Sequence, residues 1–380
     1  MCSPDDIEYT RRVAKRFLLL LGFLLAFAAT RSARASETPP SSAEDEEATG
    51  PKISIHGFLS QAYARSNGNQ IVGITEDGTA DYRAAALQIR ADITDKDAFV
   101  IQLSHERLGV SPAMDLKRDV ELDWIFYQRI FGESAVKIGR VQIPFGMYNE
   151  VRDVGTILPF FRPSLDFYGE GTFNTETVDG IVLSHTFGPW GSWSLDGDLY
   201  YGSFHFIATD TEYFLSEAKG LRGFELWLQT PLPNLRIGAG AMHFDFHDTR
   251  GSSNLDSPWS VYHIGLTAAF GGFVMNAESA YWDEGPWTFK TVYAQLGYSV
   301  TDRITLNGQI EASEFKIENF FDGDYNREKT LGVNYAFRPD LVLKVEHHWN
   351  TGYYSENPLP DISQPPLETR FWILSLSTSF

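Results

Sequence analysis

The chain has 380 residues, in which 50 Asp and Glu outnumber 31 Lys and Arg for a formal charge of −19. This acidic balance excludes a basic nucleic-acid surface, so nucleic acid is not expected as a partner. The length excludes a transporter that combines a plug domain with about 22 strands, and the single cysteine, Cys2, excludes a disulfide framework.

Residues 1–35 have the three parts of a secretory leader. A basic stretch at 11–16 precedes an apolar core of 13 residues at 17–29, and an A-x-A cleavage site at 33–35 comes before Ser36. This pattern predicts a cleaved signal peptide. Residues 10–12 resemble a twin-arginine signal, but that route exports folded proteins, so the general secretory route is favoured for a barrel. Because 13 residues are too few to span a bilayer as a helix, membrane residence requires strands.

Residues 36–52 are acidic and contain proline, which predicts a disordered periplasmic lead-in that is too small to plug a pore. Removal of residues 1–35 takes away six basic and three acidic residues. The remaining chain has 25 basic and 47 acidic residues, a formal charge of −22.

From residue 53 to residue 380 the chain forms sixteen stretches in which apolar and polar residues alternate. Seven connections between them are tight, and the other eight are expected to be long and polar. Short periplasmic turns and longer outer loops are typical of an outer-membrane barrel. The sequence therefore predicts an all-β, antiparallel transmembrane barrel of about 16 strands over 53–380, with both termini in the periplasm. The tight connections are 94–97, 131–134, 187–192, 230–234, 270–272, 300–303 and 337–340.

The two faces of most predicted strands differ in polarity, whereas the fifth, eighth and fifteenth alternate only weakly. In 80–94, Leu87 and Ile89 alternate with Gln88 and Arg90, so the first pair is expected to face lipid and the second the lumen. In the fourth strand, Trp124 and Phe126 are expected outward. Polar inward residues predict a water-filled interior, because a barrel of this size encloses more volume than its side chains fill. The charged lumen wall is expected to comprise Arg90, Asp92, Glu106, Glu121, Asp123 and Arg129.

The third long connection, at 144–175, is rich in large apolar residues, such as Phe145, Phe160 and Phe167. An external loop would be polar. Irregular backbone at membrane depth is tolerated where it is buried in protein or lines a water-filled cavity. We therefore expect this loop to fold into the lumen and to narrow the pore.

The last strand, 369–380, places Trp372, Leu374, Leu376 and Phe380 on one face, and the chain ends on that aromatic residue. The pattern looks like the C-terminal strand by which the barrel assembly machinery recognises its clients. The alternative is an ordinary edge strand.

Several short motifs in 139–163 carry a family resemblance: Gly139-Arg140, Pro144-Phe145-Gly146, Tyr148-Asn149-Glu150, Arg152-Asp153, Leu158-Pro159-Phe160 and Arg162-Pro163. This region resembles the superfamily of Gram-negative phosphate-selective porins O and P and related proteobacterial porins. The resemblance implies a sixteen-stranded barrel, usually a homotrimer, whose third loop sets the pore filter. Carried over by position, the candidate constriction residues are Arg140, Glu150, Arg152, Asp153, Arg162, Asp166 and Glu170. For each of them, an ion pair that holds the loop in shape is an equally good interpretation.

The predicted function is passive diffusion of small hydrophilic solutes and ions across the outer membrane, through contact with outer-membrane lipid and lipopolysaccharide but without cofactor or metal. The loop and lumen positions are more acidic than basic, which favours cations or neutral solutes over phosphate. One alternative is an anion-specific channel. Another is a barrel hydrolase that uses His347-His348 or the pair His243 and Asp245, although neither site has a Ser motif at a sharp turn.

Overall fold

The computed structural model describes residues 51–117, 119–169, 176–209, 213–250, 256–357 and 361–380. The predicted signal peptide and nearly all of the predicted lead-in lie outside the described residues. In the described ranges, no helix is long and apolar enough to cross a membrane.

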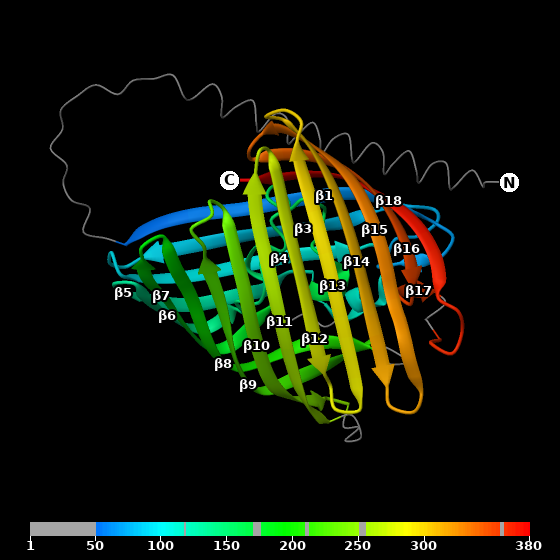
Figure 1. The fold of residues 1–380 in the computed structure, drawn as a ribbon, viewed down its shortest axis with the longest axis horizontal. Helices are drawn as coiled ribbons and strands as arrows, with labels where there is room; N and C mark the ends of the chain where they lie inside the picture. Colours follow the sequence, from blue (N-terminus) through cyan, green and yellow to red (C-terminus); the bar gives the residue numbers. More distant parts are fainter. Residues whose placement is uncertain (1–50, 118, 170–175, 210–212, 251–255, 358–360) are drawn as a thin grey trace. The chain divides into compact units, whose positions relative to one another are not determined.

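Sixteen strands of the described chain form one closed antiparallel barrel (Figure 1). Each strand pairs with its neighbours in the chain, and β1 closes the ring by pairing with β18. The fold class predicted from the alternating pattern is confirmed. The strands are β1 (Lys52–Asn67), β3 (Thr79–Asp92), β4 (Asp97–Leu108), β5 (Glu121–Phe131), β6 (Ser134–Gln142), β7 (Thr177–Trp190), β8 (Trp193–Thr209), β9 (Tyr213–Gln229), β10 (Leu235–Asp248), β11 (Ser257–Phe270), β12 (Phe273–Asp283), β13 (Trp287–Ser299), β14 (Ile304–Ile317), β15 (Phe321–Arg338), β16 (Leu341–Gly352) and β18 (Leu367–Ser379).

All seven predicted tight connections join neighbouring strands at one rim. The opposite rim differs from the prediction of eight long loops, because the connections at 284–286 and 318–320 are short. At this rim the strands continue into segments that were expected to be loops, and β15 spans 18 residues. Backbone N–H and C=O groups can form hydrogen bonds with a neighbouring strand instead of with water. A polar segment can therefore continue a strand beyond the membrane.

The face assignment holds for β3, where Leu87 and Ile89 lie on the exposed outer face, but it changes within β5. The register of β4 and β5 shifts between Gln102 and Leu103, so that Leu103 pairs with Leu122 while Gln102 pairs with Trp124. The extra residue is a β-bulge, and it exchanges the two faces of the strand beyond it.

The bulge corrects three expectations about the fourth predicted strand. Trp124 and Phe126 point inward and are each only 8% exposed. Arg129 pairs with Asp97, on the outer face that also carries Phe99, and does not line the lumen.

The last residue helps to close the barrel. The backbone N–H and C=O of Phe380 form hydrogen bonds of 3.0 and 3.1 Å with Gly57 in β1. Trp372 and Phe380 are exposed and Leu374 is half-buried, as expected for an outer face, whereas Leu376 is covered and 8% exposed.

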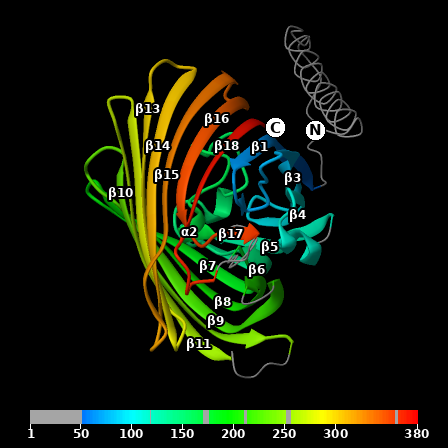
Figure 2. The same ribbon diagram turned by 90° about the vertical axis from the view of Figure 1, so that its right-hand side faces the viewer.

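The connection between β6 and β7, residues 143–176, is called loop 3, and its described residues 143–169 lie inside the barrel (Figure 2). It contains the short helices η2 (Asn149–Val151) and α2 (Leu165–Tyr168). The predicted inward fold of this loop is confirmed by its contacts with the inner wall described below.

The interior is less aqueous than the sequence predicts. Phe145 and Phe167 of loop 3 belong to one buried apolar cluster that also includes Phe204, Phe244 and Trp259 from β8, β10 and β11. Phe204, Phe244 and Trp259 lie in the halves of their strands that are away from the tight turns. Much of the barrel is therefore filled by packed side chains.

Candidate channel constriction

The stretch of loop 3 at Pro159 and Phe160 is held through its backbone carbonyls near the rim of the tight turns. Asn307 and Asn334, on β14 and β15, donate hydrogen bonds of 3.3 and 3.0 Å to the carbonyl oxygen of Pro159. The ammonium of Lys344, which is fully buried on β16, donates a 2.6 Å hydrogen bond to the carbonyl of Phe160. Buried carbonyls need such donors. The polar side chains on the inner wall of β14–β16 therefore serve to bind loop 3.

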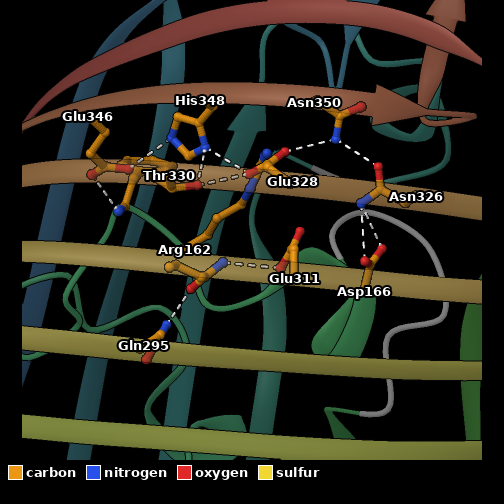
Figure 3. A network of polar contacts seen from close by, with 12 residues as sticks. Arg162, Asp166, Gln295, Glu311, Asn326, Glu328, Thr330, Glu346, His348 and Asn350 are labelled. Carbon is orange, nitrogen blue, oxygen red and sulfur yellow. Dashed lines mark hydrogen bonds and ion pairs between the residues drawn. The ribbon is translucent and has the colours of Figure 1, made fainter.

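A second group of contacts extends the attachment along β14–β16 (Figure 3). Glu346 accepts a 2.7 Å hydrogen bond from the backbone N–H of Phe161. Asn326 donates to both carboxylate oxygens of Asp166 at 3.1 Å. Around these contacts His348 lies 2.8 Å from Glu328, which also accepts a 2.9 Å hydrogen bond from Asn350.

The other end of loop 3 is attached to β12 and β13. The carboxylate of Glu278 accepts hydrogen bonds from the backbone N–H of Met147, at 2.9 Å, and from the hydroxyls of Tyr168 and Tyr293. The hydroxyl of Tyr148 donates a 2.8 Å hydrogen bond to Gln295. Buried carboxylates are stable when their acceptor capacity is used in this way.

Arg152 holds loop 3 together from within and is only 4% exposed. Its guanidinium donates hydrogen bonds to the carbonyls of Tyr168 at 3.0 Å and Gly169 at 2.7 Å. It also lies 3.3 Å from the carboxylate of Glu176. Arg152 therefore links the two ends of the loop and does not face the lumen space.

Arg162 and Asp166, two further predicted constriction residues, also serve the attachment. The guanidinium of Arg162 donates a 2.8 Å hydrogen bond to the hydroxyl of Tyr82 on β3, and Asp166 is held by Asn326. Burial raises the pKa of Asp166 to about 7. For these residues the interpretation as loop-holding contacts fits the geometry better than direct contact with a solute.

One cavity lies between loop 3 and the wall of β3–β5. The charged side chains around this space, called the acidic cavity, are Glu106, Lys117, Glu121, Asp123, Asp153 and Glu176. Lys117 forms an ion pair with Glu106, and Gln102 donates a 2.8 Å hydrogen bond to Asp123. Lys117 is the one basic side chain among these six, and Glu176 also lies 3.3 Å from the guanidinium of Arg152. Burial and the neighbouring Glu176 raise the pKa of Asp153 to about 7.

The other predicted lumen and constriction residues occupy different positions. Arg90 and Asp92 face inward near the turn end of β3 and form an ion pair at 2.7 Å. Glu150 lies 3.5 Å from Lys137, which faces inward on β6. Glu170 lies outside the described residues.

The expectation for Arg140 was wrong. Arg140 pairs in the ladder with Ile125 and Asp179, on the face of β6 opposite to Lys137, and its guanidinium binds Asp179 at 2.8 Å on the outer surface. Successive side chains of a strand point to opposite faces of the sheet. A motif carried over from a family does not specify which of its residues face the lumen.

Sequence reasoning missed several residues that the structure brings to this region, notably Lys117, Glu176, Glu278 and Lys344. Lys117 and Glu176 lay in segments read as ordinary loop. Glu278 and Lys344 lie at inward positions of their strands, so strand alternation could have found them. His348 faces inward, as expected.

The geometry does not support the proposed hydrolase sites. His243 Nδ1 lies 2.9 Å from Ser260 Oγ across the β10–β11 ladder. The two residues are paired within the β10–β11 ladder, and Ser260 does not stand at a sharp turn as the nucleophile of a Ser motif would. In the described part of the chain, no group of His, Cys, Asp and Glu has the arrangement to hold a metal ion.

No protein-family model and no curated protein matches this sequence. Among solved structures, OmpF of Salmonella typhi, in complex with daunomycin, matches with a TM-score of 0.62 and 10% identity over 87% of this chain and 98% of that chain. The outer-membrane channel DcaP of Acinetobacter baumannii matches with a TM-score of 0.58 and 10% identity, over 89% of this chain and 100% of that one. OmpT of Vibrio cholerae gives 0.57 and 11%, over 90% and 100%.

These comparisons define the class of fold. The chain has the fold of a porin-like outer-membrane barrel. At these identities the likeness concerns the fold alone, and it does not extend to the phosphate-selective superfamily that the motifs in 139–163 resemble.

Proposed function

We propose that this protein is an outer-membrane porin that lets small hydrophilic solutes and ions diffuse passively along the acidic cavity, with a preference for cations. The observation that carries the proposal is the attachment of loop 3 within the barrel. Its polar contacts with Glu278, Lys344 and Glu346 lie on β12 and β16, and Arg162 also reaches Tyr82 on β3. The acidic cavity lies beside β3–β5.

The charge of the cavity supports the preference for cations. Fixed charges act strongly on permeant ions in a narrow, partly dehydrated passage. The five carboxylates outnumber Lys117, which lines the cavity, and Arg152, which lies beside Glu176, so the field attracts cations and repels phosphate. An anion-specific channel is correspondingly disfavoured.

The setting of this channel is part of the same proposal. Residues 1–35 serve as the export signal, and the final strand, with Trp372, Leu374, Leu376 and Phe380, serves as the signal for the barrel assembly machinery. The outer face contacts outer-membrane lipid and lipopolysaccharide. A homotrimer is the proposed assembly, supported by the porin-like fold.

The test is single-channel conductance of the refolded protein in planar bilayers, with the reversal potential measured under a KCl gradient. Glu121→Gln changes a carboxylate of the cavity, and Glu133→Gln makes the same change at an exposed glutamate of the turn at 131–134. We expect stable steps, a cation-leaning reversal potential, and a shift of that potential toward zero in Glu121→Gln only.

Anion preference of the unmodified channel would overturn the charge assignment. No conductance from a verified folded barrel would overturn the porin proposal. Lipase or protease activity of the pure protein, lost in His243→Ala, would establish the enzymatic alternative.

A further inference from the structure

Three outer connections meet at one buried carboxylate above loop 3. Glu356 lies in β17 (Ser355–Asn357), which pairs with β2 (Gln70–Ile71) in a small two-stranded sheet. Its carboxylate accepts hydrogen bonds from the backbone N–H of Gly73, the hydroxyl of Ser111 and, at 3.3 Å, the side-chain amide of Gln70. The connections 68–78, 109–117 and 353–357 are thereby joined to one another.

The same carboxylate reaches the far wall of the barrel. The hydroxyl of Tyr213, at the start of β9, lies 3.3 Å from Glu356. In the closed ring, β9 is the seventh strand from β1 in one direction and the seventh from β16 in the other. These positions are nearly opposite in a ring of sixteen, so the contact spans the mouth.

Apolar packing follows the same path. Ile71, Val72 and Ile74 are at most 5% exposed and share one buried cluster with Met114 of the second outer connection and Ile207 of β8. Phe161 and Leu165 of loop 3 belong to this cluster as well. The three connections therefore rest on loop 3 and cover it from outside.

The first two of these connections pack closely against each other at Gly73. Gly73 has a φ of +74°, and a Cβ added there would lie 1.6 Å from the carbonyl oxygen of Leu108. The backbone N–H of Val110 donates a 3.1 Å hydrogen bond back to Gly73. Close contact of this kind orders the connections in one arrangement.

We propose that residues 68–78, 109–117 and 353–357 form a lid that closes the outer mouth of the barrel, and that Glu356 is its latch. The four groups that bind the carboxylate are neutral. Three belong to the outer connections, and the fourth is the hydroxyl of Tyr213 at the first residue of β9. Opening the lid breaks these contacts and the short β2–β17 pairing, but it leaves the sixteen-stranded ring intact. The latch therefore separates an occluded state from an open one.

Two measurements on the refolded full chain test the lid. The variants are Glu356→Ala and Glu356→Gln, and the matched controls are Glu318→Ala and Glu318→Gln, at an exposed glutamate of the short connection 318–320. Amide hydrogen exchange of 70–74 and 109–111 should accelerate by about tenfold in Glu356→Ala, because bonds to a buried charged group are lost. Glu356→Gln should give a smaller acceleration, and the controls none.

Single-channel conductance is the second readout and rests on the proposed porin function. Mean conductance should rise at least about twofold in Glu356→Ala, and the control variants should match the unmodified protein. Fast exchange at 70–74 and 109–111 in the unmodified protein, or equal exchange in all variants, would overturn the lid. If no variant conducts while exchange responds as expected, the lid stands and the porin proposal fails.

Discussion

Arg152 offers the strongest test of how loop 3 is held. Its guanidinium binds the carbonyls of Tyr168 and Gly169 at 3.0 and 2.7 Å and lies 3.3 Å from Glu176, with 4% of the residue exposed. Hydrogen bonds to a charged group contribute about 1.5–3 kcal/mol each, and removing one member of a buried ion pair costs about 3–5 kcal/mol. Arg152→Met keeps most of the volume and removes all these contacts. We expect the free energy of local opening of loop 3 to fall by about 3–5 kcal/mol.

The assay is amide hydrogen exchange of residues 143–169 in the refolded barrel. A loss of this size corresponds to an opening equilibrium at least about a hundredfold more favourable, and exchange should rise accordingly while the strand ladder stays protected. Arg152→Lys keeps the charge but not the forked geometry and should be intermediate. Arg327→Met is the control, since Arg327 is 67% exposed in its ion pair. Unchanged protection of 143–169 in Arg152→Met would refute the reasoning.

Three further predictions follow from single contacts. Because burial beside Glu176 raises the pKa of Asp153 to about 7, this carboxyl loses its charge as the pH falls through 7; cation preference from reversal potentials should decline over that range, and less so in Asp153→Asn. Burial disfavours the ionised form of Asp153, so loop 3 becomes more stable as the pH falls and this carboxyl takes up a proton. A Cβ at Gly155 would lie 2.2 Å from Ser60 Oγ, so Gly155→Val should displace the loop and raise exchange there, whereas an unchanged exchange pattern contradicts the close contact. Phe380→Ala should lower the yield of folded barrel in a refolding assay, and a normal yield would contradict its part in closure.

The strands and tight turns could be predicted because both follow from local sequence. Alternation marks the strands, and all seven tight connections occur where Gly, Pro and Asp interrupt it. The faces of Arg129 and Arg140 could not be predicted in the same way. They depend on register between strands, and the bulge at Gln102 and Leu103 changes that register without a local signal. The outer connections at 284–286 and 318–320 were predicted too long for a related reason. Pairing with a neighbouring strand extends the sheet into polar segments, and the sequence of one segment does not show that pairing.

The inward fold of loop 3 was predictable because its apolar residues have no other place to be buried. The roles of its charges were not. Arg152 and Asp153 are adjacent in sequence, yet the first is enclosed by the loop and the second borders the acidic cavity. Only the path of the backbone separates them, and that path is set by partners on distant strands such as Glu278 and Lys344.

The polar inner wall therefore divides into two regions with different consequences. On β12–β16 its charges are consumed by loop 3: Lys344 and Glu346 each bind a backbone group of the loop, so changes there alter the order of the loop first. On β4 and β5, Glu106 and Asp123 border the remaining space, so changes there alter the field that a permeant ion meets. The lid at Glu356 acts on access to that space, upstream of either region. Side chains on β12–β16, on β4 and β5, and at Glu356 are thus expected to affect loop order, selectivity and access respectively, whereas Asp153 and Glu176 of loop 3 couple the first two.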